Sequence, residues 1–182
     1  GYCVVTLSWL FFTVFGMLPF YFSGSIDTIT NAFFETMSGF TTTGATILDD
    51  IESLSHGMLF WRSLTQWIGG LGIVFFTIAI LPIFTTGGVQ LFSAETTGVT
   101  HDRTHPKINV MAKWLWTIYL ILTVSETILL MFGGMDLFDA ICQSFATTAT
   151  GGYSTKQNSI SYWNSPYIEY VVAIFMIISS IN

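Results

Sequence analysis

Long apolar runs alternate with short polar stretches along the chain. Three runs, over residues 2–22, 60–84 and 114–132, are 19 to 25 residues long and hold at most one charged residue each. A helix of about 20 apolar residues crosses the hydrocarbon core of a membrane, so each run predicts a transmembrane span. A fourth run, over residues 170–182, is too short to cross. We expect it to continue in a longer protein.

Two shorter amphipathic stretches follow the first and third runs. The first predicts a helix that begins with an N-cap at Ser25 or Asp27 and ends at Gly39. Such a helix is about 20 Å long at 1.5 Å per residue, which is too short to cross a membrane. The second is predicted to begin at Asp136 and end at Thr147. Both helices therefore enter the membrane only part-way.

A Thr/Gly-rich loop follows each short helix, and the whole order of elements occurs twice. An offset of 108 residues pairs Thr42 with Thr150 and Gly44 with Gly152. We predict an all-α integral membrane fold built from repeated helix–pore-loop–helix units of the potassium-channel type. The predicted units are a first repeat at 1–84, a cytoplasmic linker at 85–109, and a second repeat at 110–182 that is truncated in its last helix.

Composition and charge exclude several classes of protein. Only 9% of the 182 residues are charged, against about 25% in soluble domains. The net charge of −6, with five Lys and Arg, argues against a nucleic-acid partner. Cys3 and Cys142 lie in apolar sequence and set up neither a disulfide framework nor a metal site. An ordinary soluble enzyme is therefore excluded, and we expect no covalently bound cofactor.

The two loops carry the candidate chemistry. Irregular backbone at membrane depth is tolerated where it lines a protein-enclosed or water-filled cavity. Glycine lets successive carbonyls turn to one side, and rings of such carbonyls replace the hydration shell of K⁺ in potassium channels. The alternative is a pair of ordinary surface loops. The predicted K⁺ ligands are the backbone carbonyls of Thr42, Thr43, Gly44, Ala45, Thr150, Gly151, Gly152 and Tyr153.

The sequences around these loops resemble a known family. Residues 38–46 (SGFTTTGAT) and 149–155 (ATGGYST) look like filter segments of the Trk/Ktr/HKT superfamily of potassium transporters. Residues 87–95 (GGVQLFSAE) and 114–119 (WLWTIY) resemble the Trk branch in particular, the TrkH-type membrane subunit. The resemblance covers essentially the whole chain and identifies it as a fragment with the first two pore repeats.

The resemblance to this family also implies a number of repeats, two filter residues and an assembly. It implies four repeats around one pore, with Gly44 and Gly152 as filter glycines. Glycine at position 44, where some sodium-permeable relatives carry serine, favours potassium. It also implies a homodimer of the full-length chain in the bacterial inner membrane, with a cytosolic nucleotide-binding regulatory subunit. A third and a fourth repeat do not occur in this sequence.

The basic residues predict the orientation. Residues 85–113 hold three of the five Lys and Arg, which places this segment in the cytoplasm and both pore loops on the outside. Acidic residues then gather on the outer side, either as a cation-concentrating vestibule or as a plain solvated rim. Glu35 is expected to support the filter by hydrogen bonds rather than to touch the ion. His101 and His105 are more typical of an exposed loop than of a zinc site.

The predicted function is potassium uptake across the membrane by channel-like permeation through a carbonyl-lined filter, without enzymatic activity. One alternative is a sodium-coupled or weakly selective monovalent cation transporter of the same family. A second is a non-conducting membrane assembly subunit. A third, an intramembrane enzyme that uses Glu126 with His101 and His105, is disfavoured because a mostly apolar stretch separates these groups.

Overall fold

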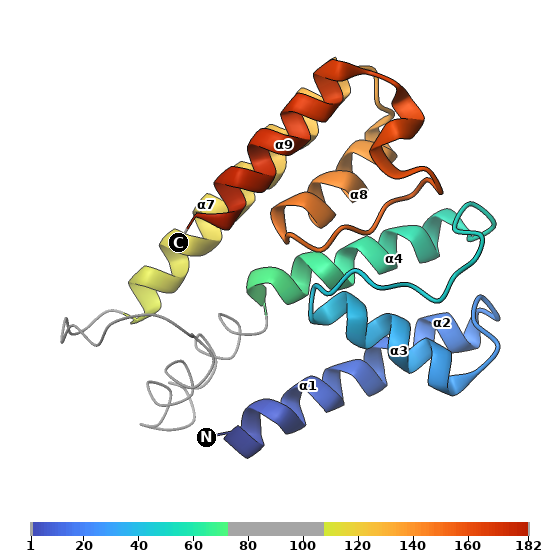
Figure 1. Ribbon diagram of the computed structural model, residues 1–182. Helices are drawn as coiled ribbons and strands as arrows, with labels where there is room; N and C mark the ends of the chain where they lie inside the picture. The colour runs from blue at the N-terminus through green and yellow to red at the C-terminus, as the bar shows by residue number, and fades with distance from the viewer. Residues whose placement is uncertain (1, 73–107, 182) are drawn as a thin grey trace.

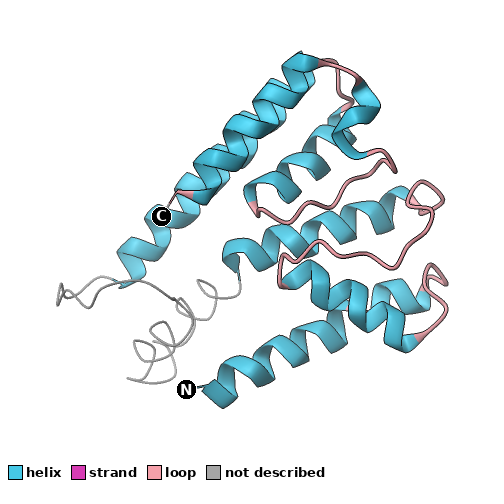
Figure 2. Ribbon diagram, viewed as in Figure 1, coloured by secondary structure: helices cyan, strands magenta, loops and turns pink. Residues whose placement is uncertain are grey.

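The computed structural model describes residues 2–72 and 108–181, and within these ranges the chain is helical without strands (Figures 1 and 2). Side chains are described from residue 113 onward in the second range. His101, His105 and most of the predicted linker lie outside the described residues. The predicted repeat boundaries therefore stay predictions.

Residues 2–72, the described part of the first repeat, contain five helical segments. They are α1 (Tyr2–Gly16), α2 (Leu18–Phe22), α3 (Ile29–Phe40), α4 (His56–Trp67) and the π-helical turn η1 (Ile68–Gly72). The first apolar run thus forms two helices with a break at Met17, and α2 has a proline in its first turn. α2 ends at Phe22, the last residue of that run.

The start of α3 corrects the sequence-based prediction. Neither Ser25 nor Asp27 is the N-cap; the Thr28 side chain accepts a hydrogen bond from the Asn31 N–H at 3.3 Å. The reason lies in the preceding turn. Ile26 is buried and its N–H bonds to the carbonyl of Phe20, so residues 25–27 fold back onto α2 before the helix begins.

The second repeat has the same order. It contains α7 (Ile108–Phe132), α8 (Leu137–Thr148), the 3₁₀ turn η2 (Ser159–Trp163) and α9 (Pro166–Ser180). Asp136 caps α8 as predicted, accepting from the Phe138 N–H at 3.1 Å. The last helix begins four residues before the predicted run, because Pro166 fits the first turn of a helix.

Apolar side chains cover the outside of the long helices. Among the described residues, one helical stretch, 113–132 within α7, is long and apolar enough to cross a membrane. Residues 6–22 and 166–180 form shorter apolar helices. Exposed apolar residues of this density are typical of a lipid-facing surface. On α7 they are Trp114, Ile118, Leu120, Ile121, Val124, Ile128, Met131 and Phe132.

Glycines in η1 let the helices approach closely. A Cβ at Gly69 would meet the backbone carbonyl of Phe40 at the end of α3, and one at Gly70 would lie 2.9 Å from Ala149. The chain also changes from α- to π-helical geometry here. Gly69 and Gly70 thus permit close packing at the point where the helix geometry changes.

The two repeats meet through α4 and α8, which contact each other directly. Figure 1 shows α8 beside α4, with the loop after α8 running between these two helices and the loop after α3 running along α4. The pore loops of the two repeats are therefore neighbours.

Candidate functional site

The two Thr-x-Gly loops share one unusual backbone conformation. Thr42 and Thr150 have φ of 53° and 54°, and Gly44 and Gly152 have φ of 76° and 86°. Left-handed φ is uncommon for a non-glycine residue and is rarer still for a β-branched one. The four residues keep the offset of 108 positions that the sequence shows. Both loops therefore alternate between left-handed and ordinary conformations, which turns successive carbonyls toward one side.

The ends of the two short helices repeat each other as well. In the first loop the N–H groups of residues 41, 42 and 43 donate to the carbonyls of residues 37, 39 and 38. In the second loop the N–H groups of residues 149, 150 and 151 donate to the carbonyls of residues 145, 147 and 146. Every donor and acceptor is displaced by 108 positions. The negative ends of the α3 and α8 dipoles therefore lie at the start of the two loops.

Six loop carbonyls are available for a ligand. No donor in the described part of the chain bonds to the carbonyl oxygens of Thr42, Thr43, Gly44, Thr150, Gly151 and Gly152. Thr43, Thr150 and Gly152 are exposed, and Thr42 and Gly44 are half-buried. Most of these carbonyl oxygens can therefore reach solvent or a cation.

Ala45 departs from the predicted set of ion ligands. Its carbonyl oxygen accepts a hydrogen bond from the Ser38 hydroxyl at 2.6 Å and lies 3.2 Å from the Tyr153 hydroxyl. The group therefore faces the protein behind the loop. The Ala45 carbonyl is therefore not in a position to bind an ion together with the other loop carbonyls.

The two loops touch each other through their backbones. A Cβ at Gly44 would collide with the carbonyl oxygen of Gly151, so only glycine permits this approach. Gln66 of α4, fully buried, accepts a hydrogen bond from the Tyr153 N–H at 3.1 Å. A side chain of the first repeat thus holds the backbone of the second loop.

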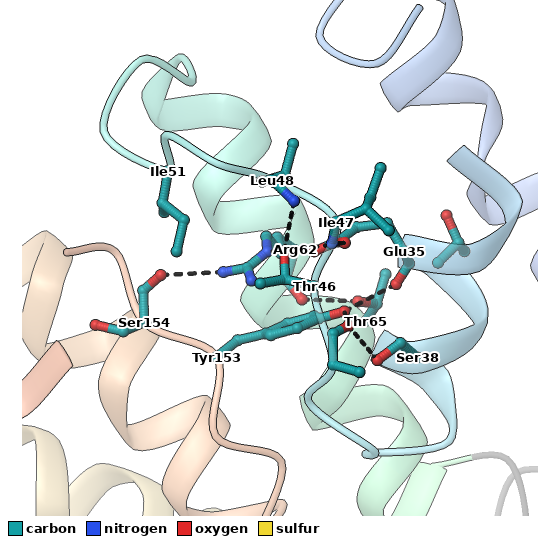
Figure 3. A network of polar contacts seen from close by, with 12 residues as sticks. Glu35, Ser38, Thr46, Ile47, Leu48, Ile51, Arg62, Thr65, Tyr153 and Ser154 are labelled. Carbon is teal, nitrogen blue, oxygen red and sulfur yellow. Dashed lines mark hydrogen bonds and ion pairs between the residues drawn. The ribbon is translucent and has the colours of Figure 1, made fainter. Parts of the chain in front are cut away.

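A buried ion pair lies behind the loops (Figure 3). Arg62 Nε donates to Glu35 Oε1 at 2.7 Å, and both residues are at most 2% exposed. The Glu35 carboxylate also accepts from the Thr46 hydroxyl at 2.9 Å and from the Ile47 N–H at 3.0 Å. Glu35 therefore supports the chain directly after the first loop, in agreement with the sequence-based hypothesis.

Arg62 is buried, and its guanidinium reaches the second repeat, where it donates to the Ser154 carbonyl at 3.0 Å. In the second loop a local carboxylate has the role of Glu35, because the Thr155 hydroxyl donates to Asp139 at 2.8 Å. Asp139 also lies 3.8 Å from the Lys156 ammonium.

The chain is similar to known transport proteins. The family model for TrkH, described as a cation transport protein, matches residues 1–182. The chain belongs to the TrkH family. It is 50% identical over its whole length to the Trk system potassium uptake protein TrkH of Escherichia coli K12, and 35% identical to TrkG of the same organism. It spans 38% of the length of each of these relatives.

A solved structure supports the fold of this TrkH-family chain. The crystal structure of the potassium transporter TrkH from Vibrio parahaemolyticus matches with a TM-score of 0.80 at 38% identity. The match covers all of this chain and 36% of that one. The helical membrane fold with pore-loop repeats is thereby confirmed.

One buried group, Gln66, has a role that the sequence did not reveal. Gln66 carried no sequence signal, because a glutamine in an apolar helix has no motif around it. Glu126 of α7 is fully buried, and neither of its carboxylate oxygens has a hydrogen-bond partner among the described residues. The acidic residues Asp49, Asp50 and Glu52 are exposed, which fits either a vestibule or a solvated rim.

Proposed function

We propose that the chain is the first part of a potassium-uptake protein, with its two Thr-x-Gly loops as filter segments. The observation that carries the proposal is the duplicated left-handed conformation at Thr42, Gly44, Thr150 and Gly152. The printed names of the relatives, potassium uptake proteins of the Trk system, support the same conclusion.

The proposed ligands are backbone oxygens, and K⁺ is cargo rather than a resident cofactor. Carbonyls of residues 42–44 and 150–152 replace part of the hydration shell of the ion. The dipoles of α3 and α8 add negative potential at the same place. No covalent chemistry is required, and dehydration of the ion is the selective step.

A complete pore needs more chain than these residues supply. Two loops give half of the carbonyls of a four-fold filter, and the chain spans 38% of the length of its relatives. We therefore propose that the remaining filter segments belong to the rest of a longer protein. A homodimer of that protein, with a cytosolic nucleotide-binding regulatory subunit, is the assembly that the family resemblance implies.

The proposed orientation, in the inner membrane with pore loops outside, follows from the basic residues near the spans. Thiol labelling of intact cells tests it, after Cys3 and Cys142 are replaced. A cysteine at Asp50 should react with a membrane-impermeant reagent, and a cysteine at Arg103 should not. Equal labelling, or labelling of position 103 alone, would contradict the orientation.

Uptake of ⁸⁶Rb⁺ tests the function itself. The full-length protein is expected to restore growth of a potassium-uptake-deficient strain in low potassium, with uptake that K⁺ inhibits far more strongly than Na⁺. Residues 1–182 alone should not restore growth, because half a filter does not enclose an ion. Equal inhibition by Na⁺ would indicate a weakly selective transporter, and absence of uptake by the full-length protein would indicate an assembly subunit.

A further inference from the structure

The ion pair between Glu35 and Arg62 has more partners than helix packing alone requires. Burial of a charged pair is costly unless further hydrogen bonds satisfy the remaining donors and acceptors. Glu35 obtains these bonds from Thr46 and Ile47, next to the first filter segment. Arg62 obtains its bond from Ser154, next to the second. The two ends of one ion pair thus hold two different loops.

The Tyr153 side chain contacts both residues of this ion pair. Its ring lies under the Arg62 guanidinium, with 3.6 Å from Cζ to the ring centroid. Its hydroxyl donates to the Glu35 carbonyl at 2.9 Å, and the Ala45 carbonyl lies 3.2 Å away. The side chain of Tyr153, in the second loop, is therefore held by the short helix and the loop of the first repeat. Figure 3 shows Tyr153 reaching across beneath Arg62.

The second repeat has no equivalent of this arrangement. The position 108 residues after Glu35 is Gln143, whose amide bonds to Thr147 of its own helix at 3.4 Å. The position 108 residues after Arg62 is Tyr170, which is 71% exposed. The contacts of Glu35, Arg62 and Tyr153 thus connect the first repeat to the second, and they are not repeated in each pore loop.

We propose that Glu35, Arg62 and the Tyr153 side chain form a positioning bridge that sets the spacing between the two filter segments. None of the three side chains contacts the ion. The bridge keeps the carbonyls of residues 42–44 and 150–152 at the separation at which they discriminate K⁺ from Na⁺. The inference rests on the proposed function of the two loops.

Tyr153→Phe is the sharpest test, because it keeps the ring under Arg62 and removes only the hydroxyl. In the full-length protein the K⁺/Na⁺ preference of ⁸⁶Rb⁺ uptake is expected to fall roughly three- to tenfold, the equivalent of losing one hydrogen bond. The amount of protein in the membrane should not change. Tyr162→Phe is the matched control, since Tyr162 is 51% exposed and outside the bridge. The K⁺/Na⁺ preference of the Tyr162→Phe variant should equal that of the wild type.

Arg62→Lys is the second variant. A lysine keeps the charge beside Glu35, but one ammonium group cannot also bond to Ser154 and stack on Tyr153 as a planar guanidinium does. Selectivity should fall again, with protein still present in the membrane. A lower protein level at unchanged preference in both variants would show that the three residues only stabilise packing, and would overturn the bridge.

The outcome for Gly44→Ser separates this inference from the function on which it rests. If Gly44→Ser lowers the K⁺/Na⁺ preference and Tyr153→Phe does not, the bridge is wrong and the filter stands. If neither variant changes the preference, while both proteins are present and transport Rb⁺, the filter assignment itself is wrong.

Discussion

Replacement of Gly44 by serine in the full-length protein is expected to reduce the K⁺/Na⁺ preference of uptake about tenfold or more. Gly44 has φ of +76°, and a Cβ there would collide with the Gly151 carbonyl oxygen of the neighbouring loop. The left-handed conformation alone costs a side chain about 1 kcal/mol or more. A loss of about 1.4 kcal/mol in differential binding corresponds to a tenfold loss of selectivity. The measurement is ⁸⁶Rb⁺ uptake in competition with K⁺ and Na⁺.

The matched control is Gly24→Ser. Gly24 also has left-handed φ, +68°, but a Cβ there meets nothing within 4 Å. It therefore carries the backbone strain without the collision and lies outside the filter loops. Gly133 would be a poor control, because a Cβ there would lie 2.8 Å from both Ile168 and Tyr167. If the K⁺/Na⁺ preference of uptake is the same in the Gly44 variant, the Gly24 variant and the wild type, residues 42–44 do not select the ion.

Gly69→Ala is expected to destabilise the protein, although alanine is the better helix former. An added Cβ would meet the Phe40 carbonyl, which belongs to backbone and cannot rotate away. Overpacking of this kind costs about 1–3 kcal/mol, more than the gain of roughly 1 kcal/mol from helix propensity. The midpoint of thermal unfolding in detergent should fall, together with the amount of protein in the membrane.

Gly57→Ala is the control for that substitution. Gly57 lies in the first turn of α4, and a Cβ there meets nothing within 4 Å. Its thermal midpoint should equal or exceed that of the wild type. Should Gly69→Ala unfold at the same temperature as Gly57→Ala, the close approach of η1 to the end of α3 would not contribute to stability.

Much of this architecture could be predicted because its signals are local. The apolar run over residues 114–132 matches the one stretch of the described residues that is long and apolar enough to cross a membrane, and Asp136 caps α8 where the sequence expects it. The duplicated Thr-x-Gly pattern predicts two matching loops, and the structure gives both the same left-handed residues. These features depend on neighbouring residues in the chain, which a single sequence displays.

Apart from Glu35, the residues behind the loops could not be predicted, because their roles depend on how the repeats pack. Arg62 and Ser154 are 92 positions apart, and Gln66 and Tyr153 are 87 apart. Similarly, the direction of the Ala45 carbonyl is set by Ser38 and by Tyr153 of the other repeat. No periodicity or spacing signals such contacts, since they arise only when α4 and α8 meet.

Anomalous X-ray diffraction from crystals of the full-length protein soaked in Tl⁺ tests the filter assignment most directly. Tl⁺ substitutes for K⁺ and scatters strongly enough to be located. Anomalous peaks are expected on the pore axis, coordinated by the carbonyl oxygens of residues 42–44 and 150–152, and excess Na⁺ should not displace them. Tl⁺ peaks away from both loops, with none beside these carbonyls, would contradict the assignment of the Thr-x-Gly loops as the selectivity filter.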